Sequence, residues 1–322
     1  MNQHPYGFRI LGSLREARRL VDASAALAGY ATCDDRAEID RESYLSAFQY
    51  DEGFRQYLSE TRSTAGFNGT CWARWIWIDI DAENDVDRGR REAVQLVTEI
   101  CARYGCANSD LLVFFSGAKG FHIGIPTTLW MPMPSADFHK VARCYLAKLA
   151  EIASVNIDLG VYDKVRAFRA PNSCHPRTGL HKRFLTFEEL SGLCAEEIRE
   201  LAREPAPFKI PSPSGTNGQA VADWQSAIET IRKEDGARAS RRFDSNNPRS
   251  LNRATLDFIC HGAAPGERAP RLFSAAANLG EFGCEIALAW ALLSEAALDS
   301  GLSPQEARRQ IECGLNHCKE EF

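Results

Sequence analysis

The sequence has no stretch of hydrophobic residues long enough to cross a membrane, and none of its eleven cysteines belongs to a CxxC pair. A transmembrane helix needs about 20 consecutive apolar residues, and the polar N-terminus lacks the apolar segment of a signal peptide. Irregularly spaced cysteines in a cytoplasmic chain are most simply free, mostly buried thiols. We therefore expect a cytoplasmic protein without membrane association and without a disulfide framework.

The chain also lacks low-complexity segments and any excess of positive charge. Its formal net charge is −5, and charged residues make up 25% of the 322 residues. This balance argues against a protein coated in basic residues, but a local positive groove could still contact nucleic-acid phosphates. Hydrophobic residues make up 44% of the chain, which is enough for a sizeable core and more than one folding unit.

The spacing of apolar residues changes along the first third of the chain. Residues 11–60 combine helix-forming composition with apolar residues at helical spacing, so we expect helices there. From Trp72 to Ile80 the period changes to two, which predicts a strand. Residues 87–105 predict an amphipathic helix that ends at Gly105.

A hairpin, a helix and another strand are expected next. LLVFFSGAKGFHIGIP (residues 111–126) predicts a β-hairpin with a four- or five-residue loop. Residues 135–153 predict a helix capped by Ser135, and residues 155–163 have the pattern of a strand with Asp158 and Gly160 on one face. This order of elements predicts a mixed α/β or α+β domain with helices packed on a sheet.

The second half of the chain has a different composition. Arg203–Asp223 contains four prolines and two glycines between helical stretches, which is typical of a linker. From about Leu251 the sequence is helical and alanine-rich, and SPQE at Ser303–Glu306 is a capping box that starts the last helix. We expect an α+β domain over residues 1–202, a linker over 203–248 and a small all-α bundle over 249–322.

Two acids, Asp79 and Asp81, end the apolar strand WIWIDID. Acids two residues apart on a strand point to the same face, and their oxygens can hold one or two divalent metal ions. The alternatives are simple solvation of the strand end and capping of a turn.

The hairpin loop SGAKGFHI is the second segment with chemical potential. Ser116, Lys119 and His122 surround Gly117 and Gly120, which let the backbone approach a ligand. Such a turn can offer N–H groups, an ammonium and an imidazole to a triphosphate. It is not a P-loop, because no GK[ST] opens a helix, and an ordinary hairpin turn is the alternative.

The third segment is a basic run that follows Asp158. Between Lys164 and Arg183 there is no acid, and such an unbalanced run indicates a bound anion, to which His175 and His181 would add donors. Its basic residues are Lys164, Arg166, Arg169, Arg177, Lys182 and Arg183.

Together the three segments predict a site for nucleotidyl transfer. Asp79, Asp81 and Asp158 would hold Mg²⁺ or Mn²⁺, and two such ions activate an attacking 3′-hydroxyl and stabilise the leaving pyrophosphate. Asp163 is an alternative to Asp158, one register shift away. Lys119, His122, Arg169 and His175 would neutralise the triphosphate.

These segments resemble the motifs of the archaeo-eukaryotic primase superfamily: a DxD, an SGxKGxH hairpin, and a late Asp followed by basic residues. DLGVYDKVRAFR is similar to the corresponding run of primase-polymerases, and NSCHPRTG is similar to the histidine segment of primase small subunits. The resemblance spans roughly residues 65–190. It implies an N-terminal α/β module with an RRM-like sheet and metal ligation by Asp79, Asp81 and Asp158. The triphosphate contacts that it implies are Ser116, Lys119, His122, Arg169 and His175, with Arg166 as a provisional addition.

The C-terminal segments TLDFICHGAAPGERAPRLFSAAANLGEFG and SPQEARRQIECGLNH resemble the helical C-terminal domain of plasmid- and phage-type primases. The implied function is a DNA-dependent primase or primase-polymerase that makes primers on single-stranded DNA from NTPs or dNTPs. A replicative helicase or a replication initiator is the further partner that the resemblance implies.

Three other interpretations remain open at this point. A metal-dependent glycosyltransferase also uses a DxD, but it does not explain the hairpin histidine or the basic run. A catalytically inactive DNA-binding module of replication initiation would not need three acids. A zinc site near the C-terminus would use Cys260, His261, Cys313, His317 and Cys318, although they lack the paired CxxC of structural zinc.

Overall fold

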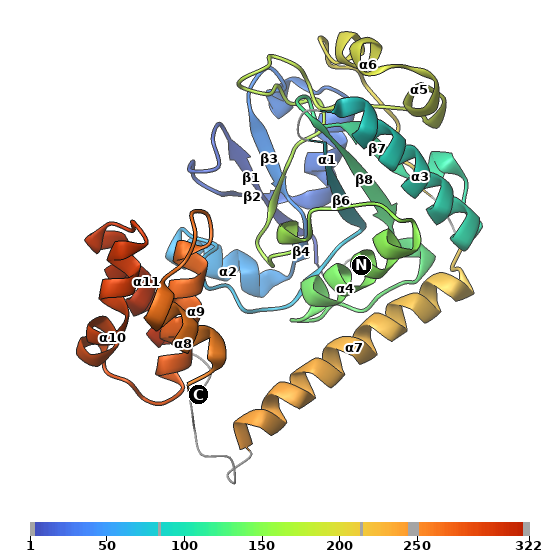
Figure 1. Cartoon of the computed structure of the whole chain (residues 1–322). Helices are drawn as coiled ribbons and strands as arrows, with labels where there is room; N and C mark the ends of the chain where they lie inside the picture. The colour runs from blue at the N-terminus through green and yellow to red at the C-terminus, as the bar shows by residue number, and fades with distance from the viewer. Residues whose placement is uncertain (1–3, 83–84, 213–214, 244–250, 318–322) are drawn as a thin grey trace. The chain divides into compact units, whose positions relative to one another are not determined.

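The computed structural model describes residues 4–82, 85–212, 215–243 and 251–317 (Figure 1). The chain divides into two compact units, Met1–Ala237 and Arg238–Phe322. The first unit is a mixed α+β structure with two antiparallel sheets, and the second is helical. The predicted fold class is therefore confirmed. In the part of the chain that the structure describes, no helix is both long enough and apolar enough to cross a membrane.

The first sheet is assembled mainly from short strands near the N-terminus. Its order is β5-β4-β1-β3-β9, with β2 paired to β1, and every pairing is antiparallel. The strands are β1 (Tyr6–Leu11), β2 (Arg19–Asp22), β3 (Ser43–Ser46), β4 (Gln49–Tyr50), β5 (Cys71–Trp72) and β9 (Ala167–Arg169).

The expectation of helices throughout residues 11–60 is wrong. The α-helices in this range are α1 (Ala23–Ala31) and α2 (Glu52–Thr61). Between them, Tyr44 of β3 pairs with Arg169 of β9, which lies far along the chain. Such long-range pairing overrides the local helical spacing, because the strand gains partners that no local pattern reveals.

The second sheet contains the DxD strand and the hairpin. Its order is β10-β7-β8-β6, again with antiparallel neighbours. The predicted strand and hairpin are confirmed, and a four-residue loop, residues 116–119, joins the two hairpin strands. The strands are β6 (Trp75–Asp81), β7 (Leu112–Phe115), β8 (Gly120–Pro126) and β10 (Arg183–Phe184).

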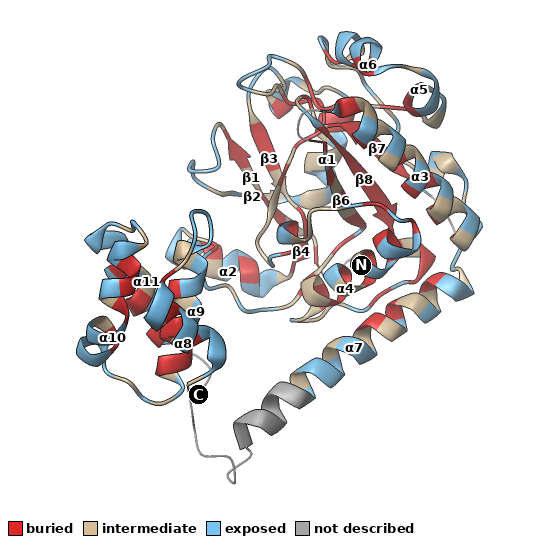
Figure 2. Cartoon of the chain, in the orientation of Figure 1, coloured by how far each residue is buried: buried red, intermediate tan, exposed pale blue. Residues whose placement is uncertain are grey.

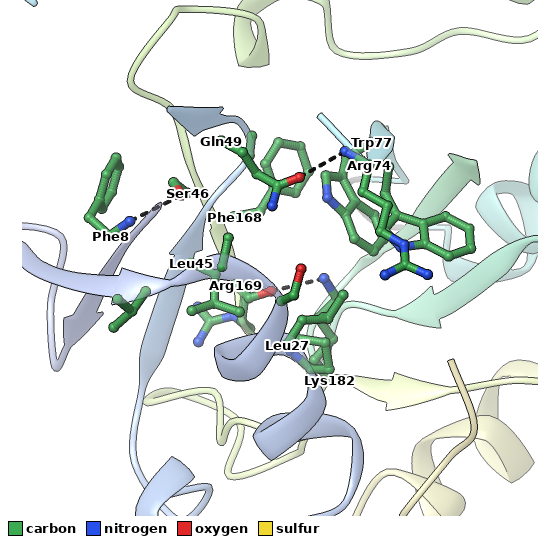
Figure 3. A pocket seen from close by; sticks show the side chains of 16 residues that line it. Phe8, Leu27, Leu45, Ser46, Gln49, Arg74, Trp77, Phe168, Arg169 and Lys182 are labelled. Atoms are coloured by element: carbon green, nitrogen blue, oxygen red, sulfur yellow. Dashed lines mark hydrogen bonds between the residues drawn. The ribbon is translucent and has the colours of Figure 1, made fainter. Parts of the chain in front are cut away.

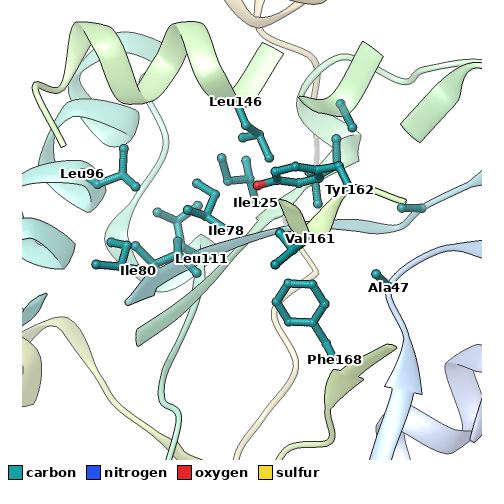
Figure 4. Packing of buried hydrophobic residues seen from close by; sticks show 14 of the residues in the cluster. Ala47, Ile78, Ile80, Leu96, Leu111, Ile125, Leu146, Val161, Tyr162 and Phe168 are labelled. Carbon is teal, nitrogen blue, oxygen red and sulfur yellow. The ribbon is translucent and has the colours of Figure 1, made fainter. Parts of the chain in front are cut away.

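Two helices, α3 (Val86–Tyr104) and α4 (Phe138–Ile152), cover one face of this sheet. Leu96 and Leu146 pack with Ile78 and Ile125 in one buried cluster (Figure 4). The buried residues concentrate on the sheet and on the inner sides of the two helices (Figure 2). The order β6-α3-β7-β8-α4, with β8 between β6 and β7, is the expected RRM-like arrangement, except that the last strand, β10, pairs with β7 rather than with β6.

The predicted end of α3 is confirmed, and the predicted cap of α4 is wrong. α3 ends at Gly105, as expected, and this glycine has a left-handed backbone with φ of 61°. The cap of α4 is Asp137 rather than the expected Ser135. Ser135 instead forms a pair of backbone hydrogen bonds with Cys71, so the chain is still extended there.

The expected linker, residues 203–248, is partly helical. Two short helices, α5 (Phe187–Gly192) and α6 (Ala195–Leu201), precede it, and α7 (Gly218–Phe243) lies entirely within it. Trp224 is only 4% exposed, and its ring lies 5.2 Å from that of Phe138 and 5.5 Å from that of Trp130. The start of α7 is thus packed on the first unit, while the domain boundaries themselves stay a prediction.

The second unit is the expected bundle of helices. Its core includes Phe258, Leu272, Leu293 and Ile311, all at most 1% exposed. The hydroxyl of Ser303 accepts a hydrogen bond from the backbone N–H of Glu306 at 3.2 Å, so the predicted start of the last helix is confirmed. The helices are α8 (Arg253–His261), α9 (Arg268–Gly280), α10 (Ile286–Asp299) and α11 (Pro304–His317).

Candidate active site

The alternation of β6 separates two acids from the core. Ile78 and Ile80 are at most 1% exposed beneath the helices, and the side chains of Asp79 and Asp81 project from the opposite face. The Asp79 side chain is 19% exposed and that of Asp81 is 49% exposed. The two acids therefore share a face, as the sequence predicts.

Asp79 is electrostatically unusual. Burial, followed by the charges of Asp81 and Asp158, raises the pKa of its carboxyl to about 7, while Lys182 and Arg166 act in the opposite sense. A divalent cation would offset the repulsion among the three carboxylates, and their oxygens are suitable ligands for Mg²⁺ or Mn²⁺. Within the described ranges, however, no group of three or more His, Cys, Asp or Glu side chains meets the geometry of a metal site. Metal ligation by this trio remains a proposal.

Asp158 does not lie on a strand, so that part of the prediction is wrong. Its carboxylate accepts the backbone N–H of Gly160 at 2.7 Å and caps a short 3₁₀ turn, Leu159–Val161. Its own N–H donates to the carbonyl of Asp79 at 2.9 Å, which fixes Asp158 beside the outer edge of β6. The alternative acid, Asp163, pairs instead with Arg166 at 3.8 Å.

The hairpin loop is closed by Ser116 and shaped by two glycines. The Ser116 hydroxyl accepts the N–H of Gly120 at 3.1 Å, and Gly117 has a left-handed φ of 82°. A Cβ on Gly120 would come within 2.4 Å of the carbonyl of Ile80, so a side chain there would push the hairpin away from the acid strand. At the loop, the Lys119 ammonium lies 3.5 Å from the Asp81 carboxylate.

The antiparallel register sets His122 directly opposite Asp79. Its Nε2 is 3.5 Å from Oδ1 of Asp79, and its ring meets Phe168 edge-on with centroids 5.2 Å apart. Burial, then the charges of Lys182 and Arg169, lowers the pKa of His122 well below its usual value. A neutral His122 would contact a triphosphate through a hydrogen bond rather than through charge, and this contact stays a prediction. Its Nδ1 is buried without a hydrogen-bond partner.

Arg169 comes from the first sheet, at the end of β9. Its guanidinium donates to the hydroxyl of Tyr44 at 3.2 Å and lies 3.7 Å from the carboxylate of Glu42. It also donates to the carbonyl of Cys174 at 3.4 Å. Glu42 and Tyr44 thus orient Arg169, a residue predicted to bind the triphosphate. Neither was predicted from the sequence, because local spacing places their segment in a helix.

The loop that carries His175 contacts the hairpin loop. Thr178 donates its hydroxyl hydrogen bond to the carbonyl of Gly117 at 2.6 Å. Nδ1 of His175 accepts from the backbone N–H groups of Arg177 and Thr178, so a neutral His175 has its proton on Nε2. Burial, then the charges of Arg169 and Arg177, lowers its pKa.

Arg166 and His181 have separate environments. The charge of Arg166 acts on Asp79 and lowers its pKa, which agrees with the provisional assignment of Arg166 to the site. The ring of His181 is 7% exposed, and its Nδ1 lies 2.6 Å from the carbonyl of Asn172. His181 is therefore a core residue of this loop rather than an open donor.

Lys182 was counted only as one member of the basic run, yet it is 1% exposed. Its ammonium donates to the carbonyl of Arg169 at 2.9 Å. Burial lowers its pKa to about 7, although the charge of Asp79 opposes the shift. The sequence carries a signal for this burial. Side chains alternate along a strand, so Lys182 lies on the same, inward-facing side as Phe184 of β10.

The alternative zinc site finds no support among the residues that the structure describes, since they contain no candidate metal cluster. Cys260 and Cys313 are exposed, and His261 lies beside Asp257 at 3.3 Å. His317 packs against Phe273 with ring centroids 5.5 Å apart. Cys318 lies outside the described residues.

Known proteins resemble this chain in structure rather than in sequence. No protein-family profile matches the chain, and no curated protein is significantly similar in sequence. The structure is similar to that of the primase RepB′, with a TM-score of 0.36 and 12% identity over 99% of this chain and 93% of that one. It is also similar to the polymerase domain of Ligase D from Mycobacterium tuberculosis, solved in complex with DNA. That match has a TM-score of 0.35 and 16% identity, over 60% of this chain and 69% of the other.

Proposed function

We propose that this chain is a template-directed nucleotidyltransferase that synthesises primers on single-stranded DNA. The substrates would be NTPs or dNTPs, and the product a short strand complementary to the template. Two independent observations support this reaction class: the resemblance of the motifs and the geometry of the site.

The observation that carries the proposal is the convergence of three distant segments. His122 lies opposite Asp79 in the register of the sheet, and the N–H of Asp158 donates to the carbonyl of Asp79. Thr178, from the loop of His175, bonds to the carbonyl of Gly117 in the hairpin loop. The acids and the groups that we propose to bind phosphate are thereby brought together beside the second sheet.

The residues fit a divalent metal in charge and donor type. Asp79, Asp81 and Asp158 would hold it, because burial and then the charges of Asp81 and Asp158 raise the pKa of Asp79, and a cation would offset both effects. When bound, Mg²⁺ or Mn²⁺ supplies activation of the attacking hydroxyl and stabilisation of the leaving pyrophosphate.

The chain's own residues would bind and orient the nucleotide. Arg169, fixed by Tyr44 and Glu42, presents a planar guanidinium suited to phosphate oxygens. His175 presents an Nε2–H, and His122 adds a neutral hydrogen-bonding group close to Asp79. Lys119 balances Asp81 and would supply charge to the outer phosphates. Ser116 would contribute chiefly by closing the loop.

Synthesis on unprimed single-stranded DNA tests the proposal. The purified chain is incubated with Mg²⁺ or Mn²⁺ and with labelled NTPs or dNTPs in separate reactions, and products are resolved by length. We expect labelled oligonucleotides that require the template. Turnover of a nucleotide sugar without template would indicate a glycosyltransferase instead. A DNA mobility shift without pyrophosphate release would indicate a binding module.

Replacing His122 by alanine is expected to raise the KM for nucleotide about tenfold. One hydrogen bond to a charged phosphate would be lost, and such a bond is worth about 1.5–3 kcal/mol. Steady-state kinetics over a range of nucleotide concentrations measure the effect.

His139→Ala is the matched control, because Nδ1 of His139 is likewise buried without a hydrogen-bond partner, but this half-buried histidine lies on α4. We expect its KM to equal that of the wild type. Unchanged KM and kcat in His122→Ala would remove His122 from the site.

A further inference from the structure

Lys182 is a fully buried lysine in a position where an apolar side chain would ordinarily be more stable. It is 1% exposed and ranks among the largest fully buried side chains of the described residues. Removing an ammonium from water is costly unless the group is paired or hydrogen-bonded. Residues that break a local rule in this way are often found at functional sites, so the surroundings of Lys182 are informative.

The ammonium of Lys182 connects the two sheets. On one side it donates to the carbonyl of Arg169 at 2.9 Å (Figure 3), and Arg169 ends β9 of the first sheet. On the other side it lies 5.0 Å from the ring centre of Trp77 and 4.8 Å from that of Phe114. These rings belong to β6 and β7 of the second sheet, and cation–π attraction acts at such distances.

The backbone of Lys182 closes the loop that carries His175. Its N–H donates to the carbonyl of Ser173 at 3.0 Å, and its carbonyl accepts the N–H of Asn172 at 2.8 Å. Lys182 therefore contacts the base of this loop, the carbonyl of Arg169, and two rings of the sheet that carries Asp79.

Lys182 is too enclosed to touch a nucleotide directly. The space beside it is a pocket between the sheets, lined in part by Trp77, Phe168 and Arg169 (Figure 3). At 1% exposure, the side chain of Lys182 presents almost no surface to this pocket. Any effect of Lys182 on the nucleotide must therefore be transmitted through Arg169 and the loop.

We propose that Lys182 is a positioning residue that sets the distance between Arg169 on the first sheet and the acid-bearing face of the second. This inference rests on the proposed function for its substrate, a nucleoside triphosphate. Without the ammonium, the carbonyl of Arg169 loses this donor, and the hydrogen bond by which Lys182 links the two sheets is lost. The guanidinium of Arg169 would then no longer be aligned with the phosphates.

Lys182→Met tests the proposal, because methionine fills similar space without charge or donor. We expect the Kd for ATP or dATP with Mg²⁺, measured by isothermal titration calorimetry, to rise about tenfold. The melting temperature should be unchanged or higher, because a buried charge is gone. A purely structural lysine would give the reverse pattern: a lower melting temperature with an unchanged Kd. Lys148→Met on α4, whose lysine contacts Ser226, is the control and should bind like the wild type.

The outcomes separate this inference from the proposed function. Equal Kd values for the wild type and Lys182→Met would overturn the positioning role, whether or not the wild type makes primers. Failure of the wild type to bind either nucleotide would overturn it too, together with the assignment of Arg169. Should Lys182→Met not fold, Lys182→Gln replaces it; this uncharged side chain is one bond too short to reach the carbonyl of Arg169, and a Kd within twofold of the wild type would overturn the inference.

Discussion

Replacing Asp79 by asparagine is expected to reduce template-directed synthesis by about 10²–10³-fold or more and to stabilise the protein by about 2–4 kcal/mol at pH 8. Both effects have one cause. The carboxylate of Asp79 is largely buried and repelled by Asp81 and Asp158, and an amide of the same shape removes that repulsion together with the charge that a cation would need.

The gain in stability is expected to depend on pH in one direction. The pKa of Asp79 rises from an ordinary 3.8 to about 7 on folding, so the folded state holds the proton more tightly. The wild type therefore loses stability as the pH rises from about 4 through about 7, and Asp79→Asn does not. The difference between the two proteins should be near zero at pH 4, should grow up to pH 7 and should then stay constant. Thermal or urea unfolding in the presence of EDTA measures it.

Asp81→Asn is the matched control for stability. Its side chain is 49% exposed, so the substitution should change the free energy of unfolding by no more than about 0.5 kcal/mol, although synthesis should still be lost. An Asp79→Asn protein that is less stable than the wild type at pH 8, or that retains full synthesis, would contradict the assignment of Asp79.

Replacing Trp224 by alanine is expected to destabilise the first unit by about 3–5 kcal/mol, the usual cost of removing a buried large aromatic side chain. Trp224 is 4% exposed and lies among the rings of Trp130, Phe138 and Tyr145. Its neighbour Asp223 binds the Arg103 guanidinium at 2.6 Å. The start of α7 is therefore part of the fold rather than a tether.

Calorimetry of the full chain, with near-ultraviolet circular dichroism, reports the unfolding of the first unit after this substitution. Gln225→Ala is the control, since Gln225 is exposed on the same helix, and it should unfold like the wild type. A Trp224→Ala protein that is within about 1 kcal/mol of the wild type would show that α7 is not docked in solution.

The central strand and the hairpin could be predicted from the sequence because their signals are local. The alternation of Ile78, Asp79, Ile80 and Asp81 specifies which side chains share a face, and the glycines around Lys119 specify a turn between two apolar runs. These local patterns specify the strand and the hairpin, and the pairing of β6 with β8 then brings the two acids beside the hairpin.

The remaining features depend on long-range pairing or on competing local signals. Tyr44 lies in β3 because β9 pairs with it, and no spacing within residues 11–60 announces that partner. Asp158 alternates with Gly160 like a strand residue, yet an aspartate next to glycine also favours a side-chain cap, which is what forms.

Two further features were not predicted: the packing of α7 and the burial of Lys182. Ala220, Trp224 and Ala227 are buried at helical spacing, a pattern present in the sequence but overshadowed by the prolines before it. The basic run indicated a bound anion, so Lys182 was predicted only as one of its basic residues, and the packing of Trp77 and Phe114 around it shows that it is buried.

The choice of nucleotide by the template is the most direct measurement of the central claim. The wild-type chain is supplied with Mg²⁺ or Mn²⁺ and either oligo(dT) or oligo(dC), and each template receives labelled A or G nucleotides in separate reactions. Our account predicts that A is incorporated on oligo(dT) and G on oligo(dC), and that Asp79→Asn incorporates neither. Incorporation that ignores the template, or none by the wild type under any of these conditions, would contradict it.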